Sequence, residues 1–119
     1  MDKKNRLLVP SEIRDALSVE DRAGLFLIPT SKFVLAWPRS FLDAYTDQQG
    51  ANPFGNLEFN RSFYSQMIFR GFDRTGRIVL PGEIAARFPK GELAIVGGGR
   101  YLELWDPTEF QARVTPLEF

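Results

Sequence analysis

Two aspartate–arginine pairs with the same spacing are the residues of this chain best suited to bind a charged ligand. Asp2-x-x-x-Arg6 and Asp73-x-x-x-Arg77 stand in the least apolar part of two similar segments. An arginine presents a planar fork of N–H donors that fits phosphate oxygens and guanine edges, and a two-stranded β-ribbon fits the major groove of DNA. We therefore interpret both arginines as candidate contacts to nucleic acid. The alternative is two surface ion pairs, each contributing at most about 1 kcal/mol to stability.

The residue before each arginine predicts a tight reversal of the chain. Asn5 precedes the first arginine and Gly76 the second, and both residue types tolerate a left-handed backbone. The carboxylates of Asp2 and Asp73 can accept backbone N–H groups across such a turn. We expect these four residues to shape the turns while the arginines project from them.

Basic residues gather around both turns although the chain carries no net charge. Its 15 basic residues are balanced by 15 acidic ones. Residues 1–14 nevertheless hold four basic residues against two acidic ones, and so do residues 70–87. The predicted DNA-binding residues are Lys3, Lys4, Arg6, Arg14, Arg74 and Arg77. Phosphate binding is dominated by such cations, so their clustering matters more than the total charge.

The two turns belong to a repeat that spans most of the chain. Residues 2–14 align without gaps on residues 73–85, at an offset of 73 − 2 = 71, and residues 24–38 resemble residues 91–107. We expect two β-rich modules, residues 1–55 and 56–119. A module of roughly 55 residues buries too little surface to be comfortably stable alone, so the two should share a core or associate with another chain.

Each repeat begins with a predicted strand that is followed by a short helix. Residues 7–9 and 78–80 are apolar runs bounded by turn residues and proline, which is typical of buried strands. The segment 10–17 has apolar residues on one helical face, with Ser11 as the expected N-cap, and the second copy repeats that spacing.

The remaining segments supply turns, a linker and one further strand. Residues 30–32 and the glycines at 97–99 each separate two β-rich runs and predict hairpins. A phosphate-binding loop is disfavoured for these glycines because such loops lead into a helix. Residues 47–60 are interpreted as a linker, and residues 63–72 as the strand that leads into the second turn. The first module is expected to lack this leading strand, since only Met1 precedes its turn.

Composition disfavours an enzyme. The chain has no cysteine and no histidine, so thiolate nucleophiles, zinc–thiolate sites and imidazole acid–base chemistry are ruled out. Glu12 and Glu83 stand in the first turn of predicted helices, where a negative charge is favoured, so capping explains them better than catalysis. We expect no metal and no cofactor. The apolar runs are too short to cross a membrane, and a cytoplasmic location is expected.

The tandem motif resembles the MraZ family, whose modules belong to the AbrB-like swapped-hairpin superfamily. The resemblance rests on Asp-x-x-x-Arg, an apolar triplet, proline and a short helix, present twice, and on Gly-x-Tyr-Leu-Glu-Leu-Trp-Asp-Pro at residues 99–107. It implies a mixed α+β fold of two such modules forming an intrachain pseudo-dimer. It also implies a nucleoid-associated regulator of the division and cell wall gene cluster, in which a ring-like homo-oligomer binds repeated elements of double-stranded DNA. The family's signature falls on Asp2, Arg6, Asp73 and Arg77, and Asn5 replaces its usual glycine.

Two alternatives to this interpretation remain. One is an AbrB-type antitoxin or transition-state regulator, although such chains carry one module and a toxin-binding tail. The other is a structural, oligomeric interaction module without DNA binding. Aromatic residues would assist a nucleic-acid site if they stacked on bases, but these stand among apolar residues and are interpreted as core or subunit interface. They are Phe26, Phe33, Trp37, Phe41, Tyr101, Trp105 and Phe110.

Overall fold

The protein combines antiparallel sheets with short helices in the computed structural model, which describes residues 1–49 and 57–117. This confirms the expected mixed α+β class. The elements in chain order are β1 (Arg6–Leu8), α1 (Ser11–Asp15), the 3-10 helix η1 (Val19–Asp21), β2 (Gly24–Pro29), β3 (Val34–Trp37), α2 (Arg39–Gln49), α3 (Leu57–Ser65), β4 (Ile68–Gly71), β5 (Arg77–Val79), α4 (Gly82–Ala85), β6 (Ala94–Gly97), β7 (Leu102–Trp105) and α5 (Pro107–Gln111).

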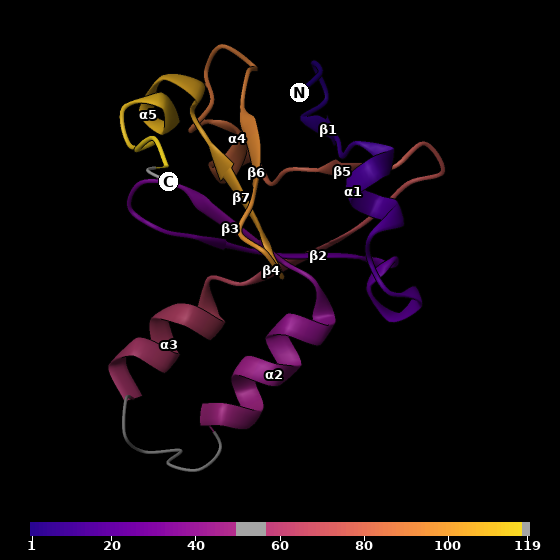
Figure 1. The fold of residues 1–119 in the computed structure, drawn as a ribbon, viewed down its shortest axis with the longest axis vertical. Helices are drawn as coiled ribbons and strands as arrows, with labels where there is room; N and C mark the ends of the chain where they lie inside the picture. The colour runs from indigo at the N-terminus through magenta and orange to yellow at the C-terminus, as the bar shows by residue number, and fades with distance from the viewer. Residues whose placement is uncertain (50–56, 118–119) are drawn as a thin grey trace.

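The strands form two sheets that interleave the two repeats. β1 pairs with β5 in a two-stranded ribbon, and the larger sheet has the order β4-β2-β3-β7-β6 with antiparallel neighbours throughout. The β3–β7 pair joins the hairpin of the first repeat to that of the second. In Figure 1 the ribbon lies to one side of the hairpins, and the α2–α3 pair extends away from the opposite end of the molecule.

An approximate two-fold relation connects the repeats. In the β2–β3 hairpin Phe26 lies opposite Trp37, and in the β6–β7 hairpin Ala94 lies opposite Trp105. Both positions shift by the same offset, 94 − 26 = 105 − 37 = 68 residues, so the two hairpins have identical registers. In the ribbon Leu7 pairs with Ile78, which are equivalent residues of the two turns.

One apolar core is shared by the two repeats. Leu7 and Ile78 point inward from the ribbon and are 5% and 0% exposed. The rest of the core comes from both hairpins, from the residues that follow β1 and β5, and from α4 and the segment after it: Val9, Leu25, Leu27, Val34, Ala36, Leu80, Ile84, Ala85, Phe88, Leu102 and Leu104. Neither repeat could bury these side chains alone, because each hairpin covers the strands of the other.

The described residues of the segment interpreted as a linker are helical, so that interpretation is wrong for them, and the strand predicted over residues 63–72 is shorter than expected. α2 extends to Gln49, and α3 occupies residues 57–65, so the strand before the second turn begins only at Ile68. The helices are stabilised by aromatic residues that recur at one-turn spacing within each of them. Tyr45 of α2 and Phe63 of α3 pack on each other and on Trp37, at ring distances of 5.2 to 5.3 Å. The module boundary expected near residue 55 lies outside the described residues.

The expected N-cap is also wrong by one residue. Pro10 occupies the N-cap of α1, and Ser11 is the first helical residue, with no side-chain hydrogen bond at the cap. The second copy repeats this arrangement with Pro81. The proline ring fixes φ near −54° in both copies, which sets the direction in which each helix leaves its strand.

The aromatic residues expected in the core lie inside or at its margin. Trp37 and Trp105 are buried, while Phe26, Phe33, Phe41, Tyr101 and Phe110 are half-buried. The indole of Trp105 stacks on Phe33 of the other repeat with ring centroids 4.6 Å apart. None of the helices within the described residues has the length and apolar character needed to span a membrane.

Candidate nucleic-acid interface

The β1–β5 ribbon places both arginines on one exposed face. Because side chains alternate across a strand, Leu7 and Ile78 face the core while their neighbours face outward. The side chains of Arg6 and Arg77 are 33% and 31% exposed. Leu8 and Val79, at 55% and 48%, share this face and lie opposite Arg77 and Arg6. The outer face of the ribbon therefore presents two arginines on an apolar, solvent-exposed strip.

Asp73 holds the second turn through four hydrogen bonds. Its Oδ1 accepts the backbone N–H groups of Thr75 and Arg77, both at 2.9 Å, and the Thr75 hydroxyl at 2.8 Å. Its Oδ2 accepts Nε of Arg77 at 3.0 Å. These donors, the backbone N–H of Arg77 first, hold the pKa of Asp73 far below its ordinary value. The carboxylate is therefore ionised and fixes both the turn and the root of the arginine fork.

Asp2 holds the first turn in the same way. Its Oδ1 accepts the backbone N–H groups of Lys4 and Arg6 at 2.9 Å, and its Oδ2 accepts Nε of Arg6 at 2.6 Å. The backbone N–H of Arg6 is the main cause of the lowered pKa of Asp2. Asn5 has φ of 60° and Gly76 of 84°, so both turns reverse through a left-handed residue.

The two turns meet in space. Nη1 of Arg77 lies 3.8 Å from Oδ2 of Asp2, the atom that also accepts from Arg6. The carboxylate of the first turn thus bridges the arginines of both turns. Sequence spacing alone places the residues 71 positions apart (77 − 6), and only the pairing of β1 with β5 brings them together.

Arg14 supports the second turn rather than extending freely into solvent. Its Nε donates to the carbonyl oxygen of Val9 at 2.9 Å, and its guanidinium lies against the backbone of Gly76. A Cβ at Gly76 would overlap the guanidinium of Arg14. The left-handed φ is therefore the main reason for glycine here, and a Cβ would also require the end of the flexible Arg14 side chain to move.

The other cations surround the arginine pair. Lys3, Lys4 and Arg74 lie within the two turns and are exposed, and among the described residues none of them forms an ion pair. Arg70, on β4, was counted in the local charge but not assigned to the site. Its Nε donates to the carbonyl of Val79 at 3.0 Å, which places it beside the ribbon. Its position on the predicted strand that leads into the second turn could have assigned Arg70 to the site from sequence.

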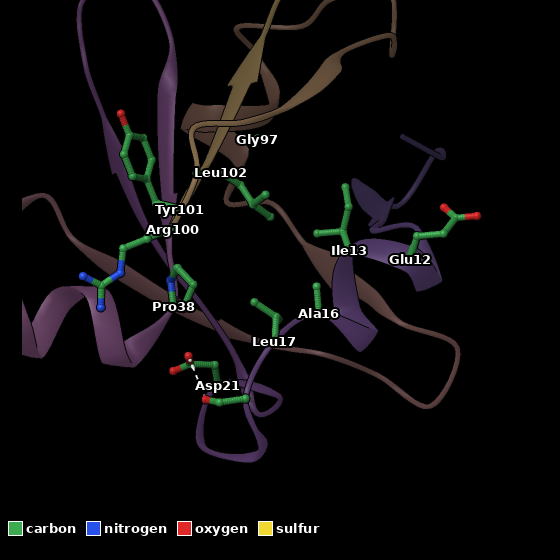
Figure 2. Close-up of a pocket in the computed structure, with 12 residues that line it drawn as sticks. Glu12, Ile13, Ala16, Leu17, Asp21, Pro38, Gly97, Arg100, Tyr101 and Leu102 are labelled. Atoms are coloured by element: carbon green, nitrogen blue, oxygen red, sulfur yellow. Dashed lines mark hydrogen bonds between the residues drawn. The ribbon is translucent and has the colours of Figure 1, made fainter.

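A cleft of about 500 Å³ lies between α1 and the β6–β7 turn. Its buried carboxylate, Asp21, accepts hydrogen bonds from Ser18 and from the N–H and hydroxyl of Ser40. Burial raises the pKa of Asp21, but these hydrogen bonds outweigh it and the net shift is downward. In Figure 2 the carboxylate of Glu12 points away from Asp21. Asp21 thus anchors α2, and it does not face Glu12 as an acid–base pair would.

The acidic side chains do not form a metal site. Among residues 1–49 and 57–117 no group of three or more acidic side chains lies close enough to hold an ion. The two turn carboxylates are each occupied by an arginine and by backbone donors. The ionised groups of this surface therefore organise cations, and the chemistry they support is the binding of an anionic partner.

Comparison with known proteins identifies relatives along nearly the whole chain. Proteins named transcriptional regulator MraZ match from Roseiflexus sp. (strain RS-1), with 30% identity over 99% of this chain and 83% of the relative, and from Pediococcus pentosaceus, with 28% identity over the same shares. The protein of that name from Caulobacter vibrioides is 30% identical over 94% of this chain and 75% of its own length. No family model matches the chain.

Proposed function

This chain belongs to the MraZ family of transcriptional regulators, and from that premise we propose that its two arginine turns bind double-stranded DNA. The observation that carries the proposal is the contact between the turns, in which Asp2 bridges Arg6 and Arg77 on the outer face of the ribbon. The relatives are named as regulators rather than enzymes, which agrees with a binding role for this surface.

The arrangement suits groove and phosphate recognition. Both arginines donate to their aspartates through Nε, so both terminal nitrogens of Arg6, and Nη2 of Arg77, remain to donate to phosphate or to guanine, while Nη1 of Arg77 lies 3.8 Å from Asp2. Holding the root of the side chain lowers the entropy lost when the arginine binds. Lys3, Lys4 and Arg74 would contact phosphates beside the ribbon, Arg14 would brace the second turn, and Arg70 would add a cation at its edge.

The charge balance of the chain is compatible with this role. Although the whole chain is neutral, seven basic side chains surround the two turns, compared with the two carboxylates of Asp2 and Asp73. They are Lys3, Lys4, Arg6, Arg14, Arg70, Arg74 and Arg77. We propose a homo-oligomer, ring-like as the family resemblance implies, with residues 1–55 and 56–119 as the paired modules of each protomer. Several turns on one assembly would bind repeated operator elements at high effective concentration. Genes for division and cell wall synthesis, and location at the nucleoid, follow from the same resemblance.

The salt dependence of DNA binding tests the proposal. A duplex selected from a random DNA library serves as the probe, and its dissociation constant is measured by fluorescence anisotropy at several salt concentrations. Each phosphate neutralised contributes about 0.9 to the slope of log affinity against log salt. We expect Arg77→Ala to weaken binding and to flatten this slope by about 1 per turn engaged.

Arg61→Ala is the matched control, because Arg61 is exposed and lies on α3, away from the β1–β5 ribbon (Figure 1). It should leave both affinity and slope unchanged. If no duplex is bound even at low salt, or if the two variants lose affinity equally, the DNA-binding proposal is wrong. The interpretation as a structural interaction module would then stand.

A further inference from the structure

Arg70 lies on β4, where the large sheet leads into the second arginine turn. β4 pairs with β2 at one edge of the five-stranded sheet, from Ile68 to Gly71. Two residues after β4 the chain enters the turn at Asp73 and then returns as β5 of the ribbon (Figure 1). β4 is therefore the element that connects the large sheet directly to the ribbon.

The side chain of Arg70 bridges the two elements. Its Nε donates to the carbonyl oxygen of Val79 on β5 at 3.0 Å, and its Nη1 donates to the carbonyl oxygen of Phe69 on β4 at 3.2 Å. Val79 lies opposite Arg6 in the ribbon. One guanidinium thus links the edge of the large sheet to the strand position that faces a proposed DNA-binding arginine, and we call this pair of hydrogen bonds the Arg70 bridge.

The carbonyl group of Phe69 points out of the large sheet. Phe72 donates to the carbonyl of Ala23 at 3.0 Å, so these residues form a hydrogen-bonded pair that continues the β2–β4 register. Hydrogen-bonded and non-hydrogen-bonded pairs alternate along an antiparallel ladder. Phe69 stands three positions before Phe72, so its carbonyl is directed away from β2.

The carbonyl group of Val79 points out of the ribbon for the same reason. Leu80 donates to the carbonyl of Asn5 at 2.8 Å and forms a hydrogen-bonded pair with it, which continues the β1–β5 register. The next pair along the ribbon is therefore non-hydrogen-bonded, and the carbonyl of Val79 faces away from β1. Arg70 supplies donors to two edge carbonyls that their own strand partners leave free.

The backbone of Arg70 is held closely against β2. Gly24 lies opposite Gly71. A Cβ on Gly24 would overlap the carbonyl oxygen of Arg70 and the ring of Phe69. That ring also packs on Phe26, with centroids 4.9 Å apart, and an aromatic ring over a neighbouring glycine helps to fix the register of a sheet. Arg70 therefore extends from a fixed point and can restrain the strand that it contacts.

Apolar contacts alone do not fix the direction of the ribbon. Leu7 and Ile78 pack into the shared core, but the burial of apolar surface is non-directional. Hydrogen bonds depend on angle as well as distance. Across residues 1–49 and 57–117, the bond from Arg70 to Val79 is the one side-chain hydrogen bond between the large sheet and the ribbon. It is therefore the contact best suited to set the orientation of the ribbon.

The guanidinium of Arg70 is used differently from those of the turn arginines. Arg6 and Arg77 donate to carboxylates through Nε. Arg70 instead donates both Nε and Nη1 to uncharged backbone carbonyls, and it forms no ion pair within the described part of the chain. Two of its three nitrogens are occupied by the protein itself, so a phosphate could bind only to Nη2 without breaking the bridge.

We propose that Arg70 is a positioning residue for DNA binding, which fixes the direction in which the ribbon presents its two arginines. The inference rests on the proposed function and goes beyond it, because there Arg70 only adds positive charge. A ribbon whose direction is fixed before binding loses less conformational freedom on the DNA, which raises the affinity.

Replacement of arginine by lysine separates positioning from a phosphate contact. Lysine keeps the charge, but its compact ammonium group lacks the planar fork that spans two carbonyls. Arg70→Lys should therefore weaken DNA binding several-fold, measured by fluorescence anisotropy with the same duplex as for Arg77→Ala. The slope of log affinity against log salt should stay unchanged, because no cation is lost.

Arg74→Lys is the matched comparison. Arg74 lies in the second turn, is exposed and has no ion-pair partner among the residues that the structure describes. We expect it to act as a point charge, which lysine replaces, so its variant should bind DNA with nearly the affinity of the unaltered protein. If Arg70→Lys binds as tightly as Arg74→Lys, Arg70 serves only as a cation and the proposal is overturned.

Amide hydrogen exchange without DNA tests the bridge independently. Arg70→Met removes both donors and keeps much of the apolar stem of the side chain. Exchange should become faster at the amides of Leu7 and Ile78, which pair across the ribbon. Exchange in the β2–β3 hairpin should not change, because a lost local contact promotes local opening.

The exchange rates also distinguish positioning from general stabilisation. An unchanged rate in the ribbon means that the bridge restrains nothing, and equal acceleration in the hairpin means that it only stabilises the whole protein. Either result overturns the proposal. If the unaltered chain binds no DNA, the proposed function fails and the positioning role fails with it, even where the exchange rates show a restrained ribbon.

Discussion

Gly76 is the residue whose replacement tests the architecture of the arginine turns most directly. It has φ of 84°, and the guanidinium of Arg14 lies where a Cβ would project. An alanine held in the left-handed region costs about 1–2 kcal/mol. The end of the flexible Arg14 side chain has to shift as well, which costs at most the hydrogen bond to Val9, about 1 kcal/mol. Gly76→Ala should therefore lower the free energy of unfolding by about 1–3 kcal/mol.

Urea unfolding followed by circular dichroism measures this loss, at one protein concentration for all variants because association adds to apparent stability. Gly82→Ala is the matched control. Gly82 begins α4, nothing lies within 4 Å of a Cβ placed there, and alanine is the better helix former by up to about 1 kcal/mol. The two substitutions should change stability in opposite directions. If Gly76→Ala costs less than about 0.5 kcal/mol, the contact with Arg14 and the left-handed turn do not matter as argued.

Two further predictions concern the shared core and the turn carboxylates. Ile78→Ala should lower the free energy of urea unfolding by about 2–5 kcal/mol, because Ile78 is 0% exposed at the centre of the ribbon. Val79→Ala, on the exposed face of the same strand, should cost less than roughly 1 kcal/mol. Equal losses in the two variants would contradict a core shared through the ribbon. Folding lowers the pKa values of Asp2, Asp21 and Asp73, so their contribution to stability is complete above about pH 5, begins to decline near pH 4, and is lost as the pH falls further through the lowered pKa values of the folded protein. Thermal unfolding between pH 3 and 7 checks this, and a melting temperature that rises on acidification would refute it.

The local turns could be predicted from sequence because their interactions span few residues. Each aspartate accepts N–H groups two and four positions ahead, and Asn5 or Gly76 supplies the left-handed residue. Residue types and spacing within five positions are enough to specify such a turn. The strands after the turns and the repeat itself were visible for the same reason, since a short apolar run bounded by turn residues and proline marks a strand without reference to its partner.

The helical pair α2–α3 could not be predicted so simply. Polar and turn-favouring residues near residues 47–60 suggested a linker, while the aromatic residues that stabilise the helices are split between them. Their packing depends on Trp37, which lies on the sheet. Tertiary contacts of this kind override local propensity, because a helix is stabilised mainly by the face that it buries.

What the sequence by itself determined is therefore the pair of arginine turns, the strands that follow them and the repeat that relates them. Tertiary structure alone decided that Asp2 contacts Arg77, that Arg70 lies beside the ribbon and that β6 ends the sheet. The physical reason is one of range. A turn is stabilised by hydrogen bonds between neighbours in the chain, whereas the meeting of two turns depends on strand pairing and on burial of a core that neither repeat can form alone.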